Sequence, residues 1–557
     1  MYRNFWSIQL PKSFQRVDHR IDRFWALGFL VAALVLFTIN LGGVPLRDWD
    51  EGTIAQVARN ISRSSSWEGW IFPTLSGLPY FNKPPLVHWL IALMYQGVGV
   101  NEWATRLPSA LLSATSVPLF YGLGLELFRQ RLPALFSTLI YLTLLPVVRH
   151  GRLAMLDGPV LCFLLLMVLF ALKGRRNLVY SLGVGLGLGL IALTKSILAL
   201  LLGTIALIFL AWDTPRLLKS EYLWMGIILG LTPVTLWYGM QLLHYGNPFL
   251  ETGLVHQSLS RIWQSVENRS GPPWYYLLEI LKLSAPWWLI FIPGLRLAWQ
   301  NRRWSWGKLV LVWASVYFTA ISIMSTKLPW YVLPLYPALA LAGGAQLTEF
   351  WRAYSQGIPR LKTRFIQTLT GCFCSLALVA WGATFYLAIA QRVSNWMILA
   401  VVGSVAVTLT VVSFLFQQGD YQFVGILAWG CYLSLLLLMA SPVWVWELEE
   451  GFAVKPVAQV LIAHTPVQQP IMTNYPHGRP SLDFYSDRRL IPAKFDQILA
   501  TWSQYPQPYL LLDPPGLQEL EARFPNGVQR LGAAEGWTLV TKSSALSPSG
   551  SSSSLWM

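Results

Sequence analysis

Long apolar runs, separated by short polar and basic clusters, occupy most of this chain. Many of them reach the ~20 residues that a helix needs to cross the hydrocarbon core of a bilayer. The first run follows Arg23; it is too long for a cleavable signal sequence and has no small-residue cleavage site. The pattern therefore predicts a mainly α-helical, polytopic membrane protein that keeps its first span.

The apolar run Leu86–Val98 decides the predicted topology, because its 13 residues are short for a span and indicate an interfacial or re-entrant segment. If this run does not cross, the later basic clusters all fall on the side of the basic N-terminal segment. These clusters lie at 129–131, 173–176, 216–219, 302–308 and 352–364. The positive-inside rule makes that side the cytoplasm. We therefore predict thirteen spans, a cytoplasmic N-terminus and an extracytoplasmic C-terminus.

The same pattern predicts a membrane domain over 1–446, with 43–104 as its first extracytoplasmic loop. A change of composition predicts a small soluble α/β domain over 447–542, followed by a Ser-rich, disordered tail over 543–557. The predicted spans run approximately over 24–42, 105–127, 132–149, 155–173, 178–193, 197–212, 222–243, 277–298, 307–325, 330–348, 366–390, 395–416 and 422–442. In the α/β domain we predict helices at 455–463 and 494–504, and strands at 471–474, 509–512 and 537–541.

Composition narrows the classes of function. The 557 residues are 54% hydrophobic and 12% charged, and the net charge of +15 comes mostly from clusters between apolar runs, so we expect no nucleic-acid partner. The four cysteines lie inside apolar runs without metal-ligand spacing, which indicates neither disulfides nor a zinc site. The glycine-rich segment 183–189 indicates close helix packing, because no strand precedes it as in a nucleotide loop.

The first external loop carries chemistry that a simple anchor would not need. Asp48, Asp50 and Glu51 place three carboxylates within four residues, and the spacing of the next apolar residues predicts an amphipathic surface helix over 50–62. An acidic cluster of this kind also suits a helix cap. Further along, Lys83 precedes two prolines, which restrict the backbone and hold the ammonium group as a phosphate ligand should be held.

On the predicted topology, more carboxylates and cations gather at the external side. They are Arg149, Arg152, Asp157, Lys195, His256, Arg261 and Lys327. Such a set suits a reaction on an anionic substrate with a hydroxyl to be deprotonated. Structural alternatives remain open: Asp157 could pair with Arg149 or Arg152, Lys195 could extend to the membrane interface, and His256 could be an ordinary surface histidine.

An ordered set of short motifs then carries a resemblance to a known family. The motifs are Asp50-Glu51, Trp70-Ile71-Phe72-Pro73, Tyr80-Phe81-Asn82-Lys83-Pro84-Pro85-Leu86, Arg106-Leu107-Pro108, Leu156-Asp157, Leu193-Thr194-Lys195, His256 with Arg261, Pro273-Trp274-Tyr275-Tyr276 and Lys327-Leu328-Pro329-Trp330-Tyr331. This set resembles the polytopic GT-C glycosyltransferases that use polyprenyl-phosphate-linked sugars. It is most similar to the lipid A aminoarabinose transferases and the bacterial protein mannosyltransferase-like enzymes.

The resemblance implies a GT-C enzyme of the plasma (inner) membrane. Such an enzyme moves a monosaccharide, with inversion, from a polyprenyl phosphate donor such as undecaprenyl phosphate to a lipid, glycan or protein acceptor. In that picture Asp50 resembles the catalytic base, with Glu51 beside it, and Asp157 resembles a second essential acid. The residues that resemble donor-phosphate ligands are Lys83, Arg261 and Tyr331, with Lys195. His256 resembles a metal-site ligand, which implies a divalent metal ion as cofactor.

Two positions depart from the family pattern. Gly52-Thr53 stands where aminoarabinose transferases usually have Thr-Arg, and Asn82 stands where they commonly have a Glu that partners the histidine. The resemblance therefore names neither the sugar nor a complete metal site. A transporter or lipid flippase is the competing hypothesis, against which stands the lack of a visible internal repeat. A non-catalytic scaffold is a third.

Overall fold

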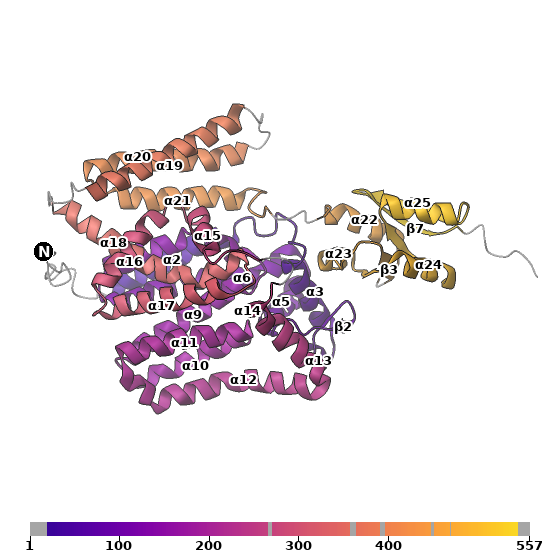
Figure 1. Ribbon diagram of the computed structural model, residues 1–557, viewed down its shortest axis with the longest axis horizontal. Coiled ribbons are helices and arrows are strands. Elements are labelled where there is room, and N and C mark those ends of the chain that lie inside the picture. The colour runs from indigo at the N-terminus through magenta and orange to yellow at the C-terminus, as the bar shows by residue number, and fades with distance from the viewer. Residues whose placement is uncertain are drawn as a thin grey trace, which may run out of the picture. The chain divides into compact units, whose positions relative to one another are not determined.

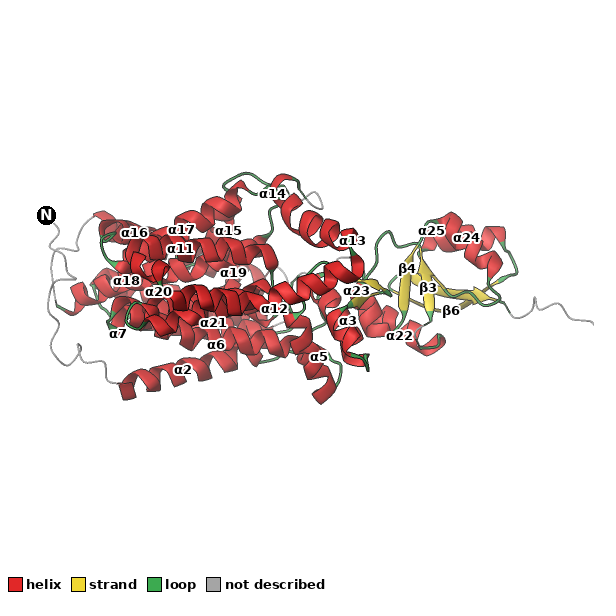
Figure 2. Cartoon of the chain, turned by 90° about the horizontal axis from the view of Figure 1, so that it is seen from below, coloured by secondary structure: helices red, strands yellow, loops and turns green. Residues whose placement is uncertain are grey.

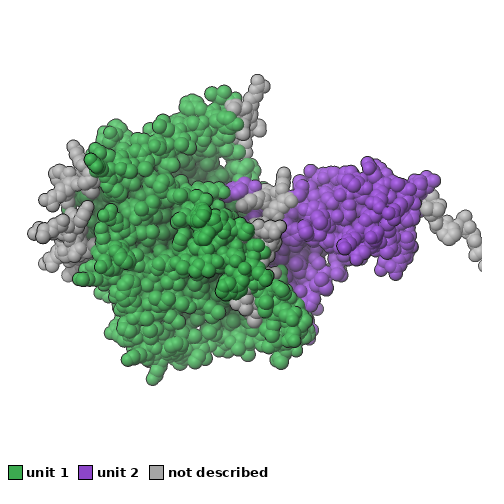
Figure 3. Space-filling view, in the orientation of Figure 1, with its two compact units in different colours: residues 1–44, 81–445 green, residues 45–80, 446–557 purple. Residues whose placement is uncertain are grey.

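The computed structural model describes residues 19–265, 270–356, 364–389, 396–446, 451–467 and 469–543. The chain divides into two compact units (Figure 3): Met1–Val44 with Phe81–Val445, and Pro45–Tyr80 with Trp446–Met557. The predicted loop 43–104 is thus shared between both units. The predicted tail, apart from Ser543, and most of the basic N-terminal segment lie outside the described residues.

The first unit is built from long apolar helices (Figure 1). Nine helices among the described residues are long and apolar enough to cross a membrane: α2 His19–Thr38, α6 Glu102–Phe128, α9 Asp157–Gly174, α11 Ser196–Asp213, α12 Glu221–Tyr245, α17 Ser305–Ile323, α19 Arg364–Ile389, α20 Trp396–Gln418 and α21 Phe423–Ala440. A tenth candidate is the pair α7 Arg131–Leu142 and α8 Leu145–Arg152, bent by 58°. The prediction of a polytopic, mainly helical protein is confirmed.

The other three predicted spans correspond to shorter or broken helices. They are η2 Leu178–Ser181 with α10 Leu182–Ala192, α15 Tyr275–Leu283 with α16 Trp288–Gln300, and η5 Pro329–Leu335 with α18 Tyr336–Ser355. The short run Leu86–Val98 forms helix α5 with the predicted bounds. Between α12 and α15 lie the short helices α13 Asn247–Phe249, η4 Leu250–Leu259 and α14 Ser260–Trp263.

Glycines bring α10 and α12 into backbone contact, as the glycine-rich segment predicts. A Cβ atom added at Gly185 would collide with the backbone of Gly226, and one at Gly189 would collide with the backbone of Gly230. Only glycine permits this approach, which brings the two backbones into direct van der Waals contact.

The second unit combines part of the first loop with the C-terminal region. Its first-loop elements are α3 Asp50–Arg63, α4 Trp67–Ile71 and the two-stranded hairpin of β1 Thr74–Leu75 and β2 Leu78–Pro79. Its C-terminal elements are α22 Val454–His464, β3 Pro470–Thr473, α23 Pro480–Ser486, β4 Arg489–Pro492, α24 Phe495–Gln504, β5 Leu510–Leu512, α25 Pro514–Arg523, β6 Val528–Ala534 and β7 Trp537–Lys542. Every helix and strand predicted for this region is present.

The C-terminal strands form one five-stranded sheet in the order β4-β3-β5-β7-β6 (Figure 2). Strand β3 pairs in parallel with β4 and β5, whereas β7 is antiparallel to β5 and β6. Consecutive residues of a strand contribute to two different hydrophobic cores. Leu511 and Leu539 pack with Leu461 of α22. Leu510 and Val540 pack with residues of α24 such as Trp502. The sheet therefore buries both faces, as the alternation of side chains along a strand requires.

Candidate functional site

Asp157 and Lys195 meet where two helices of the first unit begin. Asp157 is the first residue of α9, and Lys195 directly precedes α11. The Lys195 ammonium donates a hydrogen bond to Oδ1 of Asp157 across 2.8 Å, and the exposed fractions of the two side chains are 17% and 6%. A carboxylate at a helix N-terminus is favoured by the helix dipole, and the ammonium group supplies the opposite charge that a buried carboxylate needs.

Arg261 and Tyr331 form the second polar pair, on α14 and η5. The guanidinium of Arg261 donates to the Tyr331 hydroxyl across 3.2 Å. Backbone bonds hold the two segments together, because the amide of Thr326 donates to the carbonyl of Arg261. The Tyr331 ring also faces the Lys195 ammonium, with 5.5 Å between the nitrogen and the ring centroid, which links both pairs by a cation–π contact.

Lys83 lies in the loop before α5 and is near both polar pairs. The amide of Leu86 donates to the carbonyl of Leu193, which ties this loop to the end of α10. Two residues before Lys83, the Phe81 ring packs edge-on against Tyr245 and Phe249, with centroid distances of 4.9 and 5.7 Å. The loop is thus anchored on both sides of Lys83.

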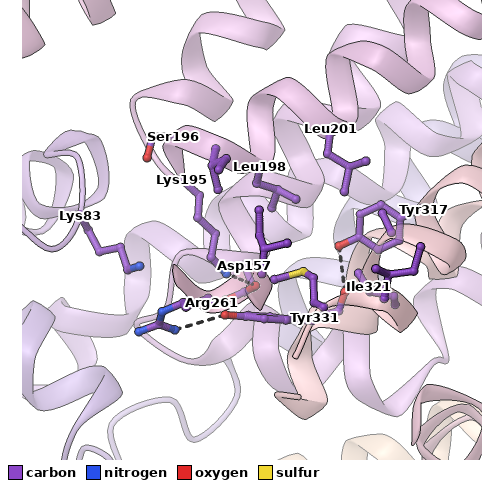
Figure 4. A pocket seen from close by; sticks show the side chains of 15 residues that line it. Lys83, Asp157, Lys195, Ser196, Leu198, Leu201, Arg261, Tyr317, Ile321 and Tyr331 are labelled. Atoms are coloured by element: carbon purple, nitrogen blue, oxygen red, sulfur yellow. Dashed lines mark hydrogen bonds and ion pairs between the residues drawn. The ribbon is translucent and has the colours of Figure 1, made fainter. Parts of the chain in front are cut away.

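These five residues line one pocket of about 350 Å³ within the first unit. Figure 4 shows the Lys83 ammonium and the Arg261 guanidinium directed toward the same end of the pocket. The rest of the lining is largely apolar and includes Ile197, Leu198, Leu201, Ile323 and Met324. The pocket can therefore hold a molecule with an anionic end and an apolar chain.

Sequence reasoning had not singled out Tyr317 or Ser196, which also line the pocket. Tyr317 is buried and donates its hydroxyl hydrogen to the backbone carbonyl of Tyr331 across 2.8 Å, so it holds the segment that carries Tyr331. No local signal marks a tyrosine in a long apolar helix. Ser196 could have been suspected from its position beside Lys195.

The carboxylates of the first loop belong to the second unit. Asp50 begins α3 and is partly exposed, with its carboxylate 3.3 Å from the Arg47 guanidinium. Glu51 is fully buried and accepts a hydrogen bond from the amide of Arg47 across 2.9 Å. Asp48 caps no helix: it is buried in an ion pair with Arg479, at 2.5 Å. The sequence predicts no role for Arg479, because no local pattern relates it to Asp48, which lies far away along the chain.

His256 lies on η4 with an exposed side chain. Throughout the part of the chain that the structure describes, no three His, Cys, Asp or Glu side chains are placed to hold a metal ion together. The described surroundings of His256 therefore do not form a ligand set. Lys327 is also accounted for, because its ammonium donates to the carbonyls of Ile321 and Ser322 at the end of α17.

Comparison with known proteins confirms the resemblance noted from the sequence. The family model for dolichyl-phosphate-mannose-protein mannosyltransferase matches residues 82–238. An undecaprenyl phosphate-alpha-4-amino-4-deoxy-L-arabinose arabinosyl transferase of Pseudomonas fluorescens is 30% identical over 343 residues, which are 59% of this chain and 61% of the relative. The transferase of that name from Erwinia tasmaniensis is 29% identical over 328 residues, 57% of this chain and 58% of the relative. The matched region thus spans about three fifths of each of these curated relatives.

Among solved structures, ArnT from Cupriavidus metallidurans bound to undecaprenyl phosphate has a TM-score of 0.74 at 21% identity, covering 94% of this chain and 99% of that chain. Its apo state has a TM-score of 0.76 at 19% identity, with the same coverage. The chain therefore has the GT-C fold of that protein.

Proposed function

We propose that this chain is an integral membrane glycosyltransferase. It transfers one monosaccharide from a polyprenyl-phosphate-linked donor to a hydroxyl group of a lipid, glycan or protein acceptor. The pocket carries the proposal, because its cations stand at one end and apolar side chains line the rest. A polyprenyl phosphate matches this arrangement, because it has an anionic phosphate at one end and an apolar chain along the rest. The similar proteins add support: two are named as undecaprenyl phosphate-linked arabinosyl transferases, and the ArnT structure contains undecaprenyl phosphate.

The charges of the pocket favour departure of the lipid phosphate. Lys83, Lys195 and Arg261 are three cations against the one carboxylate of Asp157. The donor is a phosphodiester with one negative charge, whereas the released phosphate monoester carries about −1.5 to −2 at neutral pH. Negative charge therefore grows as the bond to the sugar breaks, and fixed cations stabilise the transition state more than the bound donor.

The proposed mechanism is a single displacement with inversion. Asp50 takes the proton of the acceptor hydroxyl, whose oxygen attacks the anomeric carbon on the face opposite the phosphate. The bond between that carbon and the phosphate oxygen breaks, and its electron pair leaves with the lipid phosphate. Asp157 acts through Lys195 by holding its ammonium in place, and Glu51 is the second carboxylate in the first turn of α3.

We place this reaction at the extracytoplasmic face of the plasma (inner) membrane, with the N-terminus in the cytoplasm and the soluble α/β region outside. Two observations support this topology. Each of the thirteen predicted spans has a helical counterpart among the described residues, and the basic clusters follow the positive-inside rule.

The test compares lipid-linked sugars extracted from three kinds of cell. One lacks the protein, one carries the wild type and one carries Asp50→Asn. We expect a polyprenyl-phosphate sugar to accumulate without the protein. Wild type should remove it with release of free polyprenyl phosphate, and Asp50→Asn should not. A flippase would move the donor without cleaving it, so an unchanged total amount of lipid-linked sugar in the wild type would contradict the transferase. Normal cleavage by Asp50→Asn would remove Asp50 from the role of base.

A further inference from the structure

One buried ion pair in the second unit joins the first loop to the C-terminal region. The Arg479 guanidinium donates to Oδ2 of Asp48 from Nε across 2.7 Å and approaches the same oxygen from Nη2 across 2.5 Å. Both side chains are 2% exposed. Ser481 donates to the other carboxylate oxygen, Oδ1 of Asp48. Both oxygens of Asp48 are thus bound by C-terminal residues, although Asp48 stands only two residues before Asp50.

Arg479 is itself held from several sides. Its Nη2 donates to the carbonyl of Phe452 across 3.0 Å, and its guanidinium lies 3.8 Å from the centroid of the Phe452 ring and 5.5 Å from that of Tyr475. A planar guanidinium that is stacked and hydrogen-bonded in this way has one orientation available. It can therefore fix the position of the carboxylate that it binds.

Helix α3 packs against α23 and the residue that follows it, with contacts near both ends of α3. Near its first turn, Gly52 leaves no room for a side chain, because an added Cβ would lie 2.7 Å from the amide nitrogen of Ser481 and 2.9 Å from its Cα. Toward its other end, Arg59 donates to the carbonyl of Phe484 across 2.6 Å, and Arg63 binds Asp487 through both carboxylate oxygens at 2.7 and 2.8 Å.

The turn that leads into α3 is rigid as well. The amide of Gly52 donates to the carbonyl of Arg47, and the amide of Arg47 donates to the Glu51 carboxylate, each across 2.9 Å. A displacement of Asp48 must therefore be passed on to the first turn of α3, where Asp50 lies.

We infer that Arg479 is a positioning residue for Asp50, and that α23 is the support that sets the place of α3. The inference rests on the proposed function, in which Asp50 is the base. It gives the C-terminal region a part in the reaction: Arg479 touches neither substrate nor reacting atoms, but without it the base loses its fixed place. Gly52, one of the departures from the family pattern, is the position that lets α23 come this close.

The main variant is Arg479→Met in the full-length protein, measured in lipid nanodiscs. It leaves the Asp48 carboxylate buried without a cation, which is strongly unfavourable, so the turn before α3 must open toward water. We expect kcat to fall about 10- to 100-fold, the range that a displaced catalytic group produces. The affinity for undecaprenyl phosphate should not change, because its proposed ligands belong to the first unit. Amides of the first turn of α3 should exchange hydrogen faster.

Arg488→Met is the matched control. Arg488 is also buried in the second unit, but its guanidinium binds Thr465 and the carbonyls of Ser486 and Asp487, all within the C-terminal region. Ser486 and Asp487 lie at the end of α23 that is farther from Asp48 in sequence, so this variant should keep kcat and the slow exchange of the first turn of α3. Equal losses of kcat in both variants would mean that any damage to the C-terminal region lowers activity, and would overturn the inference.

Two further variants keep the test decisive. Asp48→Asn/Arg479→Met removes both charges, so it should fold even where Arg479→Met does not, while kcat stays low because α3 is no longer held. Normal kcat in this double variant would refute the inference. Asp50→Asn is measured in parallel: if it turns over normally, the proposed function fails. If it is inactive while the Arg479 variants are fully active, only the positioning role fails.

Discussion

Lys195 and Asp157 are 38 positions apart, yet the Lys195 ammonium donates to the Asp157 carboxylate across 2.8 Å. The pair joins the start of α9 to the start of α11 and brings opposite charges together inside the pocket. Neither residue is therefore an isolated charge in an apolar surrounding, which would be costly. Because Lys195 both pairs with Asp157 and lines the pocket, substituting it alone would change protein stability and phosphate binding together. Variants of both residues can distinguish the two effects.

The first prediction separates these effects by comparing a single variant with a double variant. Lys195→Met leaves Asp157 buried without a partner and should lower the free energy of unfolding by a few kcal/mol. Asp157→Asn/Lys195→Met should recover most of that stability, because no uncompensated charge remains. Transfer should stay low in both variants, since the departing phosphate has lost a cation. Thermal unfolding in detergent and the rate of sugar transfer are the two measurements.

Wild-type transfer in the double variant would show that Lys195 serves only to pair with Asp157. Lys282 gives a control within the same unit: it lies on α15 and does not line the pocket, so Lys282→Met should leave both quantities unchanged.

The second prediction concerns the hydroxyl group of Tyr331. Tyr331→Phe removes the acceptor of the Arg261 hydrogen bond but keeps the ring beneath Lys195. A hydrogen bond to a charged group contributes about 1.5–3 kcal/mol, so we expect the affinity for undecaprenyl phosphate to fall about tenfold or more. Binding titrations in nanodiscs measure this. Tyr222→Phe, at an exposed position outside the pocket, is the control. Unchanged affinity would mean that Arg261 needs no support from Tyr331.

The third prediction tests the contact between α10 and α12. Gly185→Ala places a methyl group against the backbone of Gly226, so the helices must separate. We expect a lower unfolding temperature and, because α11 and Lys195 follow α10 directly, weaker lipid-phosphate binding. Gly239→Ala is the control on α12, since a Cβ there meets no atom within 4 Å. Equal stability of the two variants would show that this contact is not needed.

The helices were predictable because the membrane imposes one requirement on every span: enough consecutive apolar residues. The break between α7 and α8 was not, since hydropathy reports length and polarity but not bending. The strands of the second unit were predictable where a short apolar run ends at turn residues, as at Leu510–Leu512 before Asp513 and Pro514. Short elements such as α23 carry too few residues for a periodic signal.

The partners of charged residues were the least predictable feature. Asp157 pairs with Lys195 and not with the arginines closer in sequence; Arg152, for example, donates to carbonyls of Leu36 and Ile39 near the end of α2. Partner choice depends on which helix ends meet, and that is a property of packing. Likewise, no local pattern could reveal that Asp48 pairs with Arg479.

The last prediction uses the titration of Asp483, which is buried in α23. Burial raises the pKa of Asp483 to about 7, although hydrogen bonds from Ser76 and from the amide of Leu490 act in the opposite direction. The unfolded carboxyl titrates at about 3.9. Between these values the folded state holds the extra proton, so the stability of the second unit falls as the pH rises, and it levels off above pH 7.

Asp483→Asn imitates the protonated acid at every pH, because its amide can donate to Ser76 while its oxygen accepts from Leu490. Hydrogen exchange in β4 and in the β1–β2 hairpin should slow down in this variant at pH 8 and differ little from wild type at pH 5. Asp487 shows the opposite pH dependence. Its hydrogen bond with Arg63 lowers its pKa, so its contribution to the stability of the second unit is present at neutral pH and is lost on acidification. A wild-type exchange rate that does not change between pH 5 and 8, after correction for intrinsic exchange, would contradict a buried titrating group at position 483.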